Sequence, residues 1–229
     1  MSEQVLMQPT VTLESPHVPY VRYDEYLALP HEDHLIEWVN GKVIHHMPPL
    51  AIHQLLISYL DKLIGLYVDL FSRGRVFIAP FEMKCHPEKR SREPDLLFVA
   101  TANLDRLGDG HRLMGPADLV IEILSDDSVS RDYDDKFVEY EECGVQEYWI
   151  VDPRPRRKRA TFYQRGADGR FDSVKAENGV YRSRVLEGFW LNVAWLWDMP
   201  DPALTFGEII GLSEQTMSEL RAKKVTADQ

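Results

Sequence analysis

The stretches EPDLLFVA, residues 93–100, and ADLVIEIL, residues 117–124, decide the fold of this chain. Each is a nearly unbroken run of apolar residues, which is typical of a strand covered on both faces of a sheet. Each also carries an acid, Asp95 near the start of the first and Glu122 inside the second. An ionised carboxylate in such a strand is costly unless it is paired or binds a metal ion. We therefore expect Glu122 to be compensated by a positive group.

Helical and strand-like segments alternate around these two runs. Apolar residues recur at helical spacing over residues 52–71 and 130–144. Asn40-Gly41 lies between two apolar-rich runs and predicts a hairpin, because both turn positions need positive φ. Further strands are expected for RVFIAPFEM and EYWIVD. Because a helix lies between strands, the order predicts an α/β fold with a mixed β-sheet flanked by helices.

The chain beyond residue 153 predicts a β-meander. Three strand-like segments, RATFYQ, FDSVKA and VYRSRVL, are separated by the turn signals Asp168-Gly169 and Asn178-Gly179. No internal repeat or low-complexity linker divides the chain, and its 229 residues fit one domain. We expect a flexible N-terminal segment, a single domain and a C-terminal helix or tail, over residues 1–17, 18–204 and 205–229.

Composition limits the classes of function. Hydrophobic residues make up 44% and charged residues 28% of the chain, which are ordinary globular values and exclude a disordered or fibrous protein. The 26 Lys and Arg against 37 Asp and Glu give a formal net charge of −11. The overall field therefore repels polyanions, and a nucleic-acid partner would need a local positive patch.

The sequence favours a cytoplasmic protein that does not enter a membrane. The N-terminal residues lack a basic start followed by an apolar run, and charges interrupt the apolar stretch over residues 55–71. Cys85 and Cys143 are the only cysteines, and neither belongs to a CxxC pair. We expect reduced thiols without a disulfide framework.

Several catalytic motifs are absent from the sequence. It contains no GxxxxGK[ST], GxGxxG, GxSxG or HExxH, which removes the P-loop, dinucleotide-binding, α/β-hydrolase and zincin interpretations. Its histidines are scattered without the spacing of a zinc site. The placement of carboxylates is therefore the informative feature.

The two apolar runs that carry Asp95 and Glu122 can pair as antiparallel strands in more than one register. One register places Asp95 opposite Ile123, another places it opposite Glu122, and a slip of one residue decides the face of each acid. Opposite each other, the two Cβ atoms lie about 4.5–5.5 Å apart, and the carboxylates repel unless a cation lies between them. Mg²⁺ accepts one or two carboxylates with water and phosphate oxygens, and the Ile123 carbonyl is a further candidate ligand. The alternative is a buried ion pair of Glu122 with Arg or Lys, while Asp95 caps a turn after Pro94.

Pro94-Asp95, followed by Glu122 in an apolar strand, resembles the pattern of the PD-(D/E)xK nuclease superfamily. More narrowly, EPDLLFVA, ADLVIEILSDDS and RDYDDKFVEYEECGVQEYWIVDP, with IEWVNGKVIHHMPP upstream, resemble the Uma family of restriction endonucleases. The resemblance covers residues 24–153, with several motifs in the same order. It implies a restriction-endonuclease-like core and a divalent-metal-dependent endonuclease that acts on DNA. It also implies that Asp95 and Glu122 hold Mg²⁺, or Mn²⁺ in its place.

The lysine of the superfamily pattern is displaced in this chain. Two residues after the second acid the sequence has Leu124, so the resemblance assigns the catalytic role to Lys136 in the following predicted helix. A solvated lysine paired with Asp132 at i−4 is the alternative. Lys136 lies about 60° around the helix from Tyr133, at the margin of the apolar stripe rather than opposite it.

Two residues upstream complete the expected site. Glu37 matches the acid that the family carries before its hairpin turn, and it shares a strand face with Leu35 and Val39. It is expected to bind metal through water or to orient the nucleophile, unless it is a strand-edge charge that reaches solvent. His53 is expected to contact a phosphate or to orient Glu37, and a capping or core role explains it equally well.

Two basic clusters offer local positive charge. The first cluster precedes Asp95 and contains Lys84, Lys89, Arg90 and Arg92. The second follows Asp152-Pro153 and contains Arg154, Arg156, Arg157, Lys158 and Arg159. Because the first leads directly into the site, we expect nucleic acid to bind to Lys89, Arg90 and Arg92. A solvated hairpin tip or the protection of an edge strand explains the second equally well.

Two main classes of function remain open on the sequence, and a different metal-dependent phosphoesterase that acts on RNA or nucleotides is a weaker third. The first is the metal-dependent nuclease, with DNA as its partner and a homodimer favoured, because paired cuts in duplex DNA suit two-fold symmetry. The second is a nuclease-like fold that no longer cuts and serves as a binding or assembly module. The acidic balance and the missing strand lysine favour the second class. The presence of Glu37, Asp95, Glu122 and Lys136 favours the first.

Overall fold

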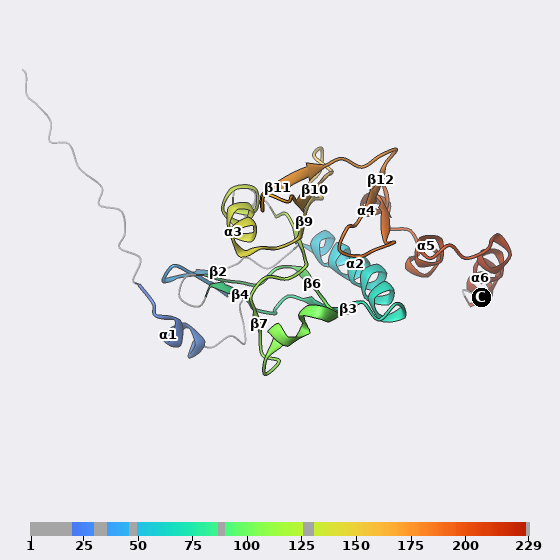
Figure 1. Ribbon diagram of the computed structural model, residues 1–229. Coiled ribbons are helices and arrows are strands. Elements are labelled where there is room, and N and C mark those ends of the chain that lie inside the picture. Colours follow the sequence, from blue (N-terminus) through green and yellow to red (C-terminus); the bar gives the residue numbers. More distant parts are fainter. Residues whose placement is uncertain (1–19, 30–35, 46–49, 87–89, 126–130, 228–229) are drawn as a thin grey trace, which may run out of the picture.

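A computed structural model of the chain describes residues 20–29, 36–45, 50–86, 90–125 and 131–227. In this part of the chain, the strands form a six-stranded, a five-stranded and a two-stranded sheet. Helices lie against the sheets (Figure 1). This mixed α/β architecture confirms the predicted fold class. The expected flexible segment over residues 1–17 lies outside the described residues.

The larger sheet contains both apolar runs that carry the acids Asp95 and Glu122. Its strand order is β11-β10-β9-β8-β6-β3. β6 and β8 are antiparallel with Leu96 opposite Ile121, whereas β8 and β9 are parallel with Ile123 opposite Val151. All five residues of β8 are buried, as its apolar sequence predicts. The strands are β3 (Gly74–Ile78), β6 (Leu96–Ala100), β8 (Leu119–Ile123), β9 (Glu147–Asp152), β10 (Arg159–Arg165) and β11 (Phe171–Val174).

The smaller sheet has the order β2-β1-β5-β4-β7. Its first two strands form the predicted hairpin, with φ of 49° at Asn40 and 80° at Gly41. The strands of this sheet are β1 (Ile36–Val39), β2 (Lys42–His45), β4 (Met83–His86), β5 (Arg90–Arg92) and β7 (Leu113–Met114). β12 (Val180–Arg182) and β13 (Trp190–Asn192) pair separately.

Two helices cover opposite faces of the larger sheet (Figure 1). The helix α2 packs Leu56 and Leu60 into a core cluster with Trp149, and α3 contributes Tyr140 to a second cluster with Tyr148. Among the described residues, no helix is long and apolar enough to cross a membrane. The helical segments are α1 (Tyr23–Leu27), α2 (Ala51–Leu70), η1 (Thr101–Leu107), η2 (Arg131–Asp135), α3 (Lys136–Cys143), α4 (Trp195–Asp198), α5 (Pro202–Ile209) and α6 (Glu214–Ala227).

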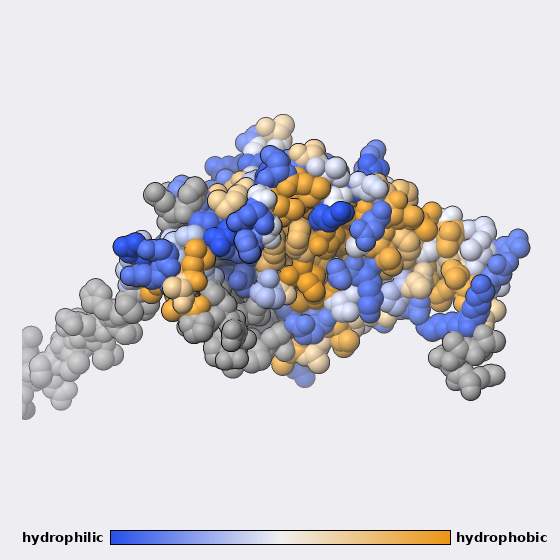
Figure 2. All heavy atoms as spheres, turned by 90° about the horizontal axis from the view of Figure 1, so that it is seen from below, coloured by the Kyte–Doolittle hydropathy of each residue, from blue (hydrophilic) through white to orange (hydrophobic). Residues whose placement is uncertain are grey.

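Apolar side chains also lie at the surface. Figure 2 shows an apolar area across the middle of the face seen from below, with hydrophilic residues around it. The exposed side chains of the helix α2 include Leu55, Leu66 and Leu70. Apolar surface is common on folded proteins, so this area does not by itself identify a binding face.

The run RVFIAPFEM forms two strands instead of the single strand expected. β3 ends at Ile78 in the larger sheet, and β4 begins at Met83 in the smaller one. Between them lies the cis Ala79–Pro80 bond, and proline has no N–H to continue a ladder. The predicted C-terminal strands are present, although β12 pairs with β13 and not with β11.

The two cysteines are bonded to each other. Cys85 in β4 and Cys143 at the end of α3 form a disulfide across a sequence separation of 58 residues. The expectation of free thiols is therefore wrong, and the argument that it supplied for a reducing compartment is lost. The spacing of two cysteines does not reveal whether their Cβ atoms come within bonding distance, which depends on the packing of α3 against β4.

One buried carboxylate, that of Glu147, is surrounded by hydrogen-bond donors. Glu147, at the start of β9, is fully buried and accepts hydrogen bonds from the Trp149 indole, the Tyr181 and Ser183 hydroxyls and two backbone amides. Burial raises the pKa of Glu147, and these donors oppose the rise. The bonds attach the segment after β12 to the larger sheet.

A buried lysine anchors the smaller sheet to α1. The Lys84 ammonium lies 3.0 Å from the centroid of the Tyr23 ring and 5.0 Å from that of the Trp38 ring. It has no hydrogen-bond partner among the described residues. Burial lowers the pKa of Lys84 to about 8, although Glu82 opposes the change.

Lys84 should make stability depend on pH in alkaline solution. The folded protein loses this proton near pH 8, whereas the unfolded chain keeps it to about pH 10.4, so the free energy of unfolding should rise with pH between these values. Relative to Lys84→Met, the wild type should gain about 2 kcal/mol between about pH 8 and pH 10. Urea unfolding of both proteins measures this. Parallel pH profiles for the two would contradict the interpretation.

Candidate active site

The two predicted acids lie at corresponding positions of neighbouring strands. The register of β6 and β8 continues from Leu96 opposite Ile121, so Asp95 lies opposite Glu122. Of the two registers considered, the second is therefore correct. Asp95 Oδ2 accepts a hydrogen bond of 2.7 Å from the Ile123 amide. The Ile123 backbone thus lies beside Asp95, and the role of its carbonyl as a metal ligand stays a prediction.

Lys136 lies directly on the second acid. It is the first residue of α3, and its Nζ is 2.8 Å from Glu122 Oε2. The Tyr140 hydroxyl donates to the other carboxylate oxygen, Oε1, at 2.6 Å. Lys136 is only 4% exposed, which excludes the solvated lysine that was its alternative. The displaced lysine therefore reaches the acids from the helix instead of from the strand.

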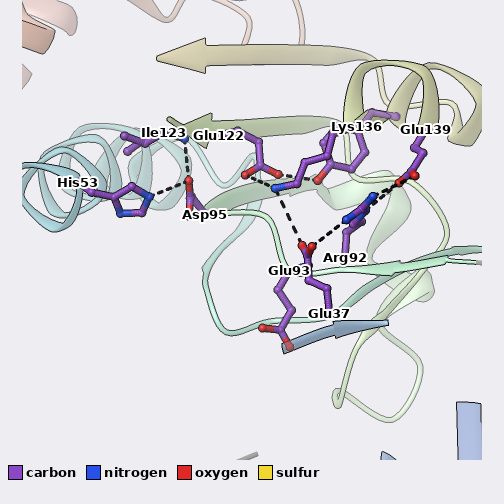
Figure 3. Close-up of polar contacts among 10 residues, drawn as sticks. Glu37, His53, Arg92, Glu93, Asp95, Glu122, Ile123, Lys136 and Glu139 are labelled. Atoms are coloured by element: carbon purple, nitrogen blue, oxygen red, sulfur yellow. Dashed lines mark hydrogen bonds and ion pairs between the residues drawn. The ribbon is translucent and has the colours of Figure 1, made fainter. Parts of the chain in front are cut away.

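Glu37 extends this arrangement into the smaller sheet. Its Oε1 is 4.0 Å from Lys136 Nζ, and its Oε2 accepts a 2.8 Å hydrogen bond from Arg92. Arg92 also donates to both oxygens of Glu139, at 2.7 and 3.0 Å. Figure 3 shows the resulting series of alternating charges, which is Glu139, Arg92, Glu37, Lys136 and Glu122. Glu37 is 2% exposed, so it is not a strand-edge charge in solvent.

Arg92 is not available to nucleic acid, contrary to expectation. It is 3% exposed and enclosed by two carboxylates. Burial lowers the pKa of the guanidinium, but Glu37 and Glu139 outweigh burial and raise it overall. Lys84 of the same cluster is also buried. Of the other two predicted contacts, Lys89 lies outside the described residues, and nothing is described of the Arg90 side chain.

His53 contacts Asp95 and not Glu37. It lies in the first turn of the helix α2, and its Nε2 is 3.2 Å from Asp95 Oδ2 (Figure 3). Its other ring nitrogen, Nδ1, is buried without a hydrogen-bond partner among the described residues. The predicted contact with Glu37 is therefore absent from the described site, whereas a position beside the acids is present.

Three further residues belong to the site but were not expected there. Glu93 donates its backbone N–H to Glu37, and burial, followed by the charges of Glu37 and Glu82, raises its pKa to about 7. Glu139 and Tyr140 follow Lys136 by three and four residues, so they lie on the same side of the helix as that lysine. Helical spacing from Lys136 was the signal that would have found both.

The site contains oxygen donors of the type that a hard divalent cation binds. Asp95 and Glu122 supply carboxylate oxygens from adjacent strands, which are the ligands that Mg²⁺ and Mn²⁺ accept. Among the described residues, no group of three or more His, Cys, Asp or Glu side chains gathers around one point. Water and phosphate oxygens would therefore complete the coordination, which is usual for Mg²⁺.

A match to a family model shows which protein family the chain belongs to. Residues 23–194 match the model of Uma2, described as "Putative restriction endonuclease". The chain belongs to this family. The Uma2 match includes every site residue named above and confirms the resemblance found in the sequence.

A solved structure has a similar fold. It is the crystal structure of a "putative nuclease belonging to DUF820" from Anabaena variabilis ATCC 29413, with a TM-score of 0.64 and 19% sequence identity. The alignment covers 78% of this chain and 98% of that chain. No curated protein gives a significant match. At this identity the structural likeness supports the nuclease-like fold and nothing finer.

Removal of the Arg92 guanidinium should strongly destabilise the protein. Arg92→Gln removes the 2.8 Å partner of the buried Glu37, which keeps Lys136 at 4.0 Å, and the partner of the largely buried Glu139, and breaking a buried ion pair costs about 3–5 kcal/mol. Urea unfolding measures the loss. The exposed Arg184 provides the control, because Arg184→Gln should change stability by no more than about 0.5 kcal/mol. A loss below about 1 kcal/mol for Arg92→Gln would show that the ion pairs are not structural.

Proposed function

We propose that this protein is a divalent-metal-dependent endonuclease that hydrolyses phosphodiester bonds in DNA. The observation that carries the proposal is the position of the Lys136 ammonium, 2.8 Å from Glu122 and 4.0 Å from Glu37, with Asp95 on the adjoining strand. Carboxylates on adjoining strands can hold a cation, and an amino group beside them can stabilise charge that develops on a phosphate. Membership of the Uma2 family supports a nuclease.

Each site residue has a role in this proposal. Asp95 and Glu122, with the Ile123 carbonyl, would hold Mg²⁺ or Mn²⁺, which would activate the phosphate and lower the pKa of a bound water. Lys136 would donate a hydrogen bond to the attacking water or to a phosphate oxygen.

The remaining residues would support these groups. Glu37 would position the Lys136 ammonium from the side opposite Glu122. Arg92 would act as a positioning residue through Glu37, because it binds that carboxylate without reaching the surface. His53 would orient Asp95 through its 3.2 Å contact, and its proposed contact with the substrate phosphate stays a prediction.

DNA is the proposed partner, and a homodimer is the proposed assembly. A dimer with two-fold symmetry would bring two sites to the two strands of a duplex, which suits paired cuts. The family description supports a nucleic-acid substrate. The choice of DNA over RNA rests on the resemblance to restriction endonucleases.

A nuclease-like module that does not cut is the second candidate. Protein cations already compensate two of the acids, because Lys136 contacts Glu122 and Arg92 contacts Glu37. A purely structural network of buried ion pairs would have this appearance. The net charge of −11 also favours this candidate.

Substitution of the site should abolish metal-dependent cleavage. Asp95→Asn and Lys136→Met should each reduce Mg²⁺-dependent nicking of supercoiled DNA about 100-fold or more, because the first removes a ligand charge and the second removes the ammonium. Asp105→Asn and Lys62→Met, which alter exposed residues outside the site, are the matched controls and should cut like the wild type. Wild-type rates in either site variant would refute the assignment.

Metal binding separates the two candidate functions. Calorimetry should detect binding of Mn²⁺ to the wild type and its loss in Glu122→Gln, because the carboxylate charge provides most of the affinity. Asp109→Asn, at an exposed position outside the site, controls for a general loss of negative charge. Equal heats for the wild type and Glu122→Gln would favour the module that does not cut.

A further inference from the structure

The turn between β9 and β10 lies at the same edge of the larger sheet as the acids. β8 and β9 run parallel, with Glu122 opposite Ile150 and Ile123 opposite Val151. Their carboxyl ends therefore meet at one edge, where Asp95 and His53 also lie (Figure 3). The chain leaves β9 at Asp152 and returns at Arg159, so residues 153–158 form a turn at this edge.

Four positive side chains occupy this turn or its end. All four are exposed, namely Arg156, Arg157, Lys158 and Arg159. No carboxylate of the described residues lies within ion-pair distance of them, although the charge of Arg157 helps to lower the pKa of Asp152. Such a concentration contrasts with the net charge of −11 for the whole chain. A local positive surface of this kind attracts phosphate groups even when the overall field repels them.

The backbone of the turn is held in place by its fifth basic residue. Arg154 donates from Nε and Nη2 to the two oxygens of Asp152, both at 2.8 Å. The Arg154 carbonyl in turn accepts from the amides of Arg157 and Lys158, at 3.0 and 3.3 Å. Arg154 is thus used to fix the turn, while the other basic side chains project from a defined backbone.

One of the two alternative explanations for this cluster, the protection of an edge strand, loses its support. Protection of an edge strand does not apply, because β9 lies between β8 and β10, and β10 lies between β9 and β11. Two of the four members of the basic cluster before Asp95, Lys84 and Arg92, are buried and do not offer positive surface. The β9–β10 turn therefore offers exposed positive charge at the same edge of the sheet as the acids.

We propose that the β9–β10 turn binds the phosphate backbone of DNA next to the phosphodiester bond that is cut. This inference rests on the proposed nuclease function. Arg156, Arg157, Lys158 and Arg159 would contact phosphates without reading bases, so they would contribute affinity and position and no sequence preference. The turn would in this way overcome the repulsion between DNA and an acidic protein.

The dependence of DNA binding on salt tests this proposal. Each phosphate contact adds about 0.9 to the slope of log affinity against log salt. In Arg156→Gln/Lys158→Gln, the loss of affinity between about 50 and 200 mM salt should therefore be about 12-fold smaller than in the wild type. Fluorescence anisotropy of a labelled DNA duplex measures this, with Ca²⁺ in place of Mg²⁺ to occupy oxygen ligands.

The matched control removes the same charge from the opposite end of the sheet. Arg182 and Arg184 are exposed in and after β12, beside Gln164 at the far end of the β9–β10 ladder. Arg182→Gln/Arg184→Gln should keep the wild-type slope. Equal slopes for all three proteins, or a wild type that does not bind DNA, would overturn the proposal.

Cleavage and salt-slope measurements on the same proteins distinguish a failure of this inference from a failure of the proposed function. If the wild type cuts DNA and the turn variant keeps its salt slope, the nuclease stands and the role of the turn is refuted. If the wild type does not cut, but the slope falls only in the turn variant, the turn binds DNA and the catalytic assignment fails.

Discussion

The contact of one buried ammonium with two carboxylates joins the parts of this protein. Lys136, at the start of α3, is paired with Glu122 of the larger sheet and lies 4.0 Å from Glu37 of the smaller one. Arg92 and Glu139 continue the series between the smaller sheet and α3. The relative position of the two sheets therefore depends on charges that must be compensated once they are buried.

Burying charges of this kind costs free energy, because each ion loses its contact with water. The contrast with Glu147 is informative, because that acid is satisfied by hydroxyl, indole and amide donors. Glu122 instead has a lysine, and Asp95, on the neighbouring strand, lies beside a histidine. A fold that needs only stability can replace buried ion pairs with apolar residues at little cost. The proposed function would give these charges a use beyond stability, because it assigns them to metal binding and catalysis.

The sequence predicted more of this site than of its surroundings. The apolar runs placed Asp95 and Glu122 on neighbouring strands, but the register, and hence their face, came only from tertiary structure. Arg92 was expected at the surface because a sequence displays charge and not burial. The bonding of Cys85 to Cys143 was missed for a similar reason, since it depends on how α3 packs against β4. The roles assigned to the site residues stay predictions.

A crystal structure with Mn²⁺, recorded at the manganese absorption edge, tests the central claim most directly. The account predicts an anomalous peak within coordination distance of the Asp95 and Glu122 carboxylates, beside the Lys136 ammonium. A saturated crystal without a peak there, with Lys136 still paired to Glu122, would show that the acids serve only to hold the fold together.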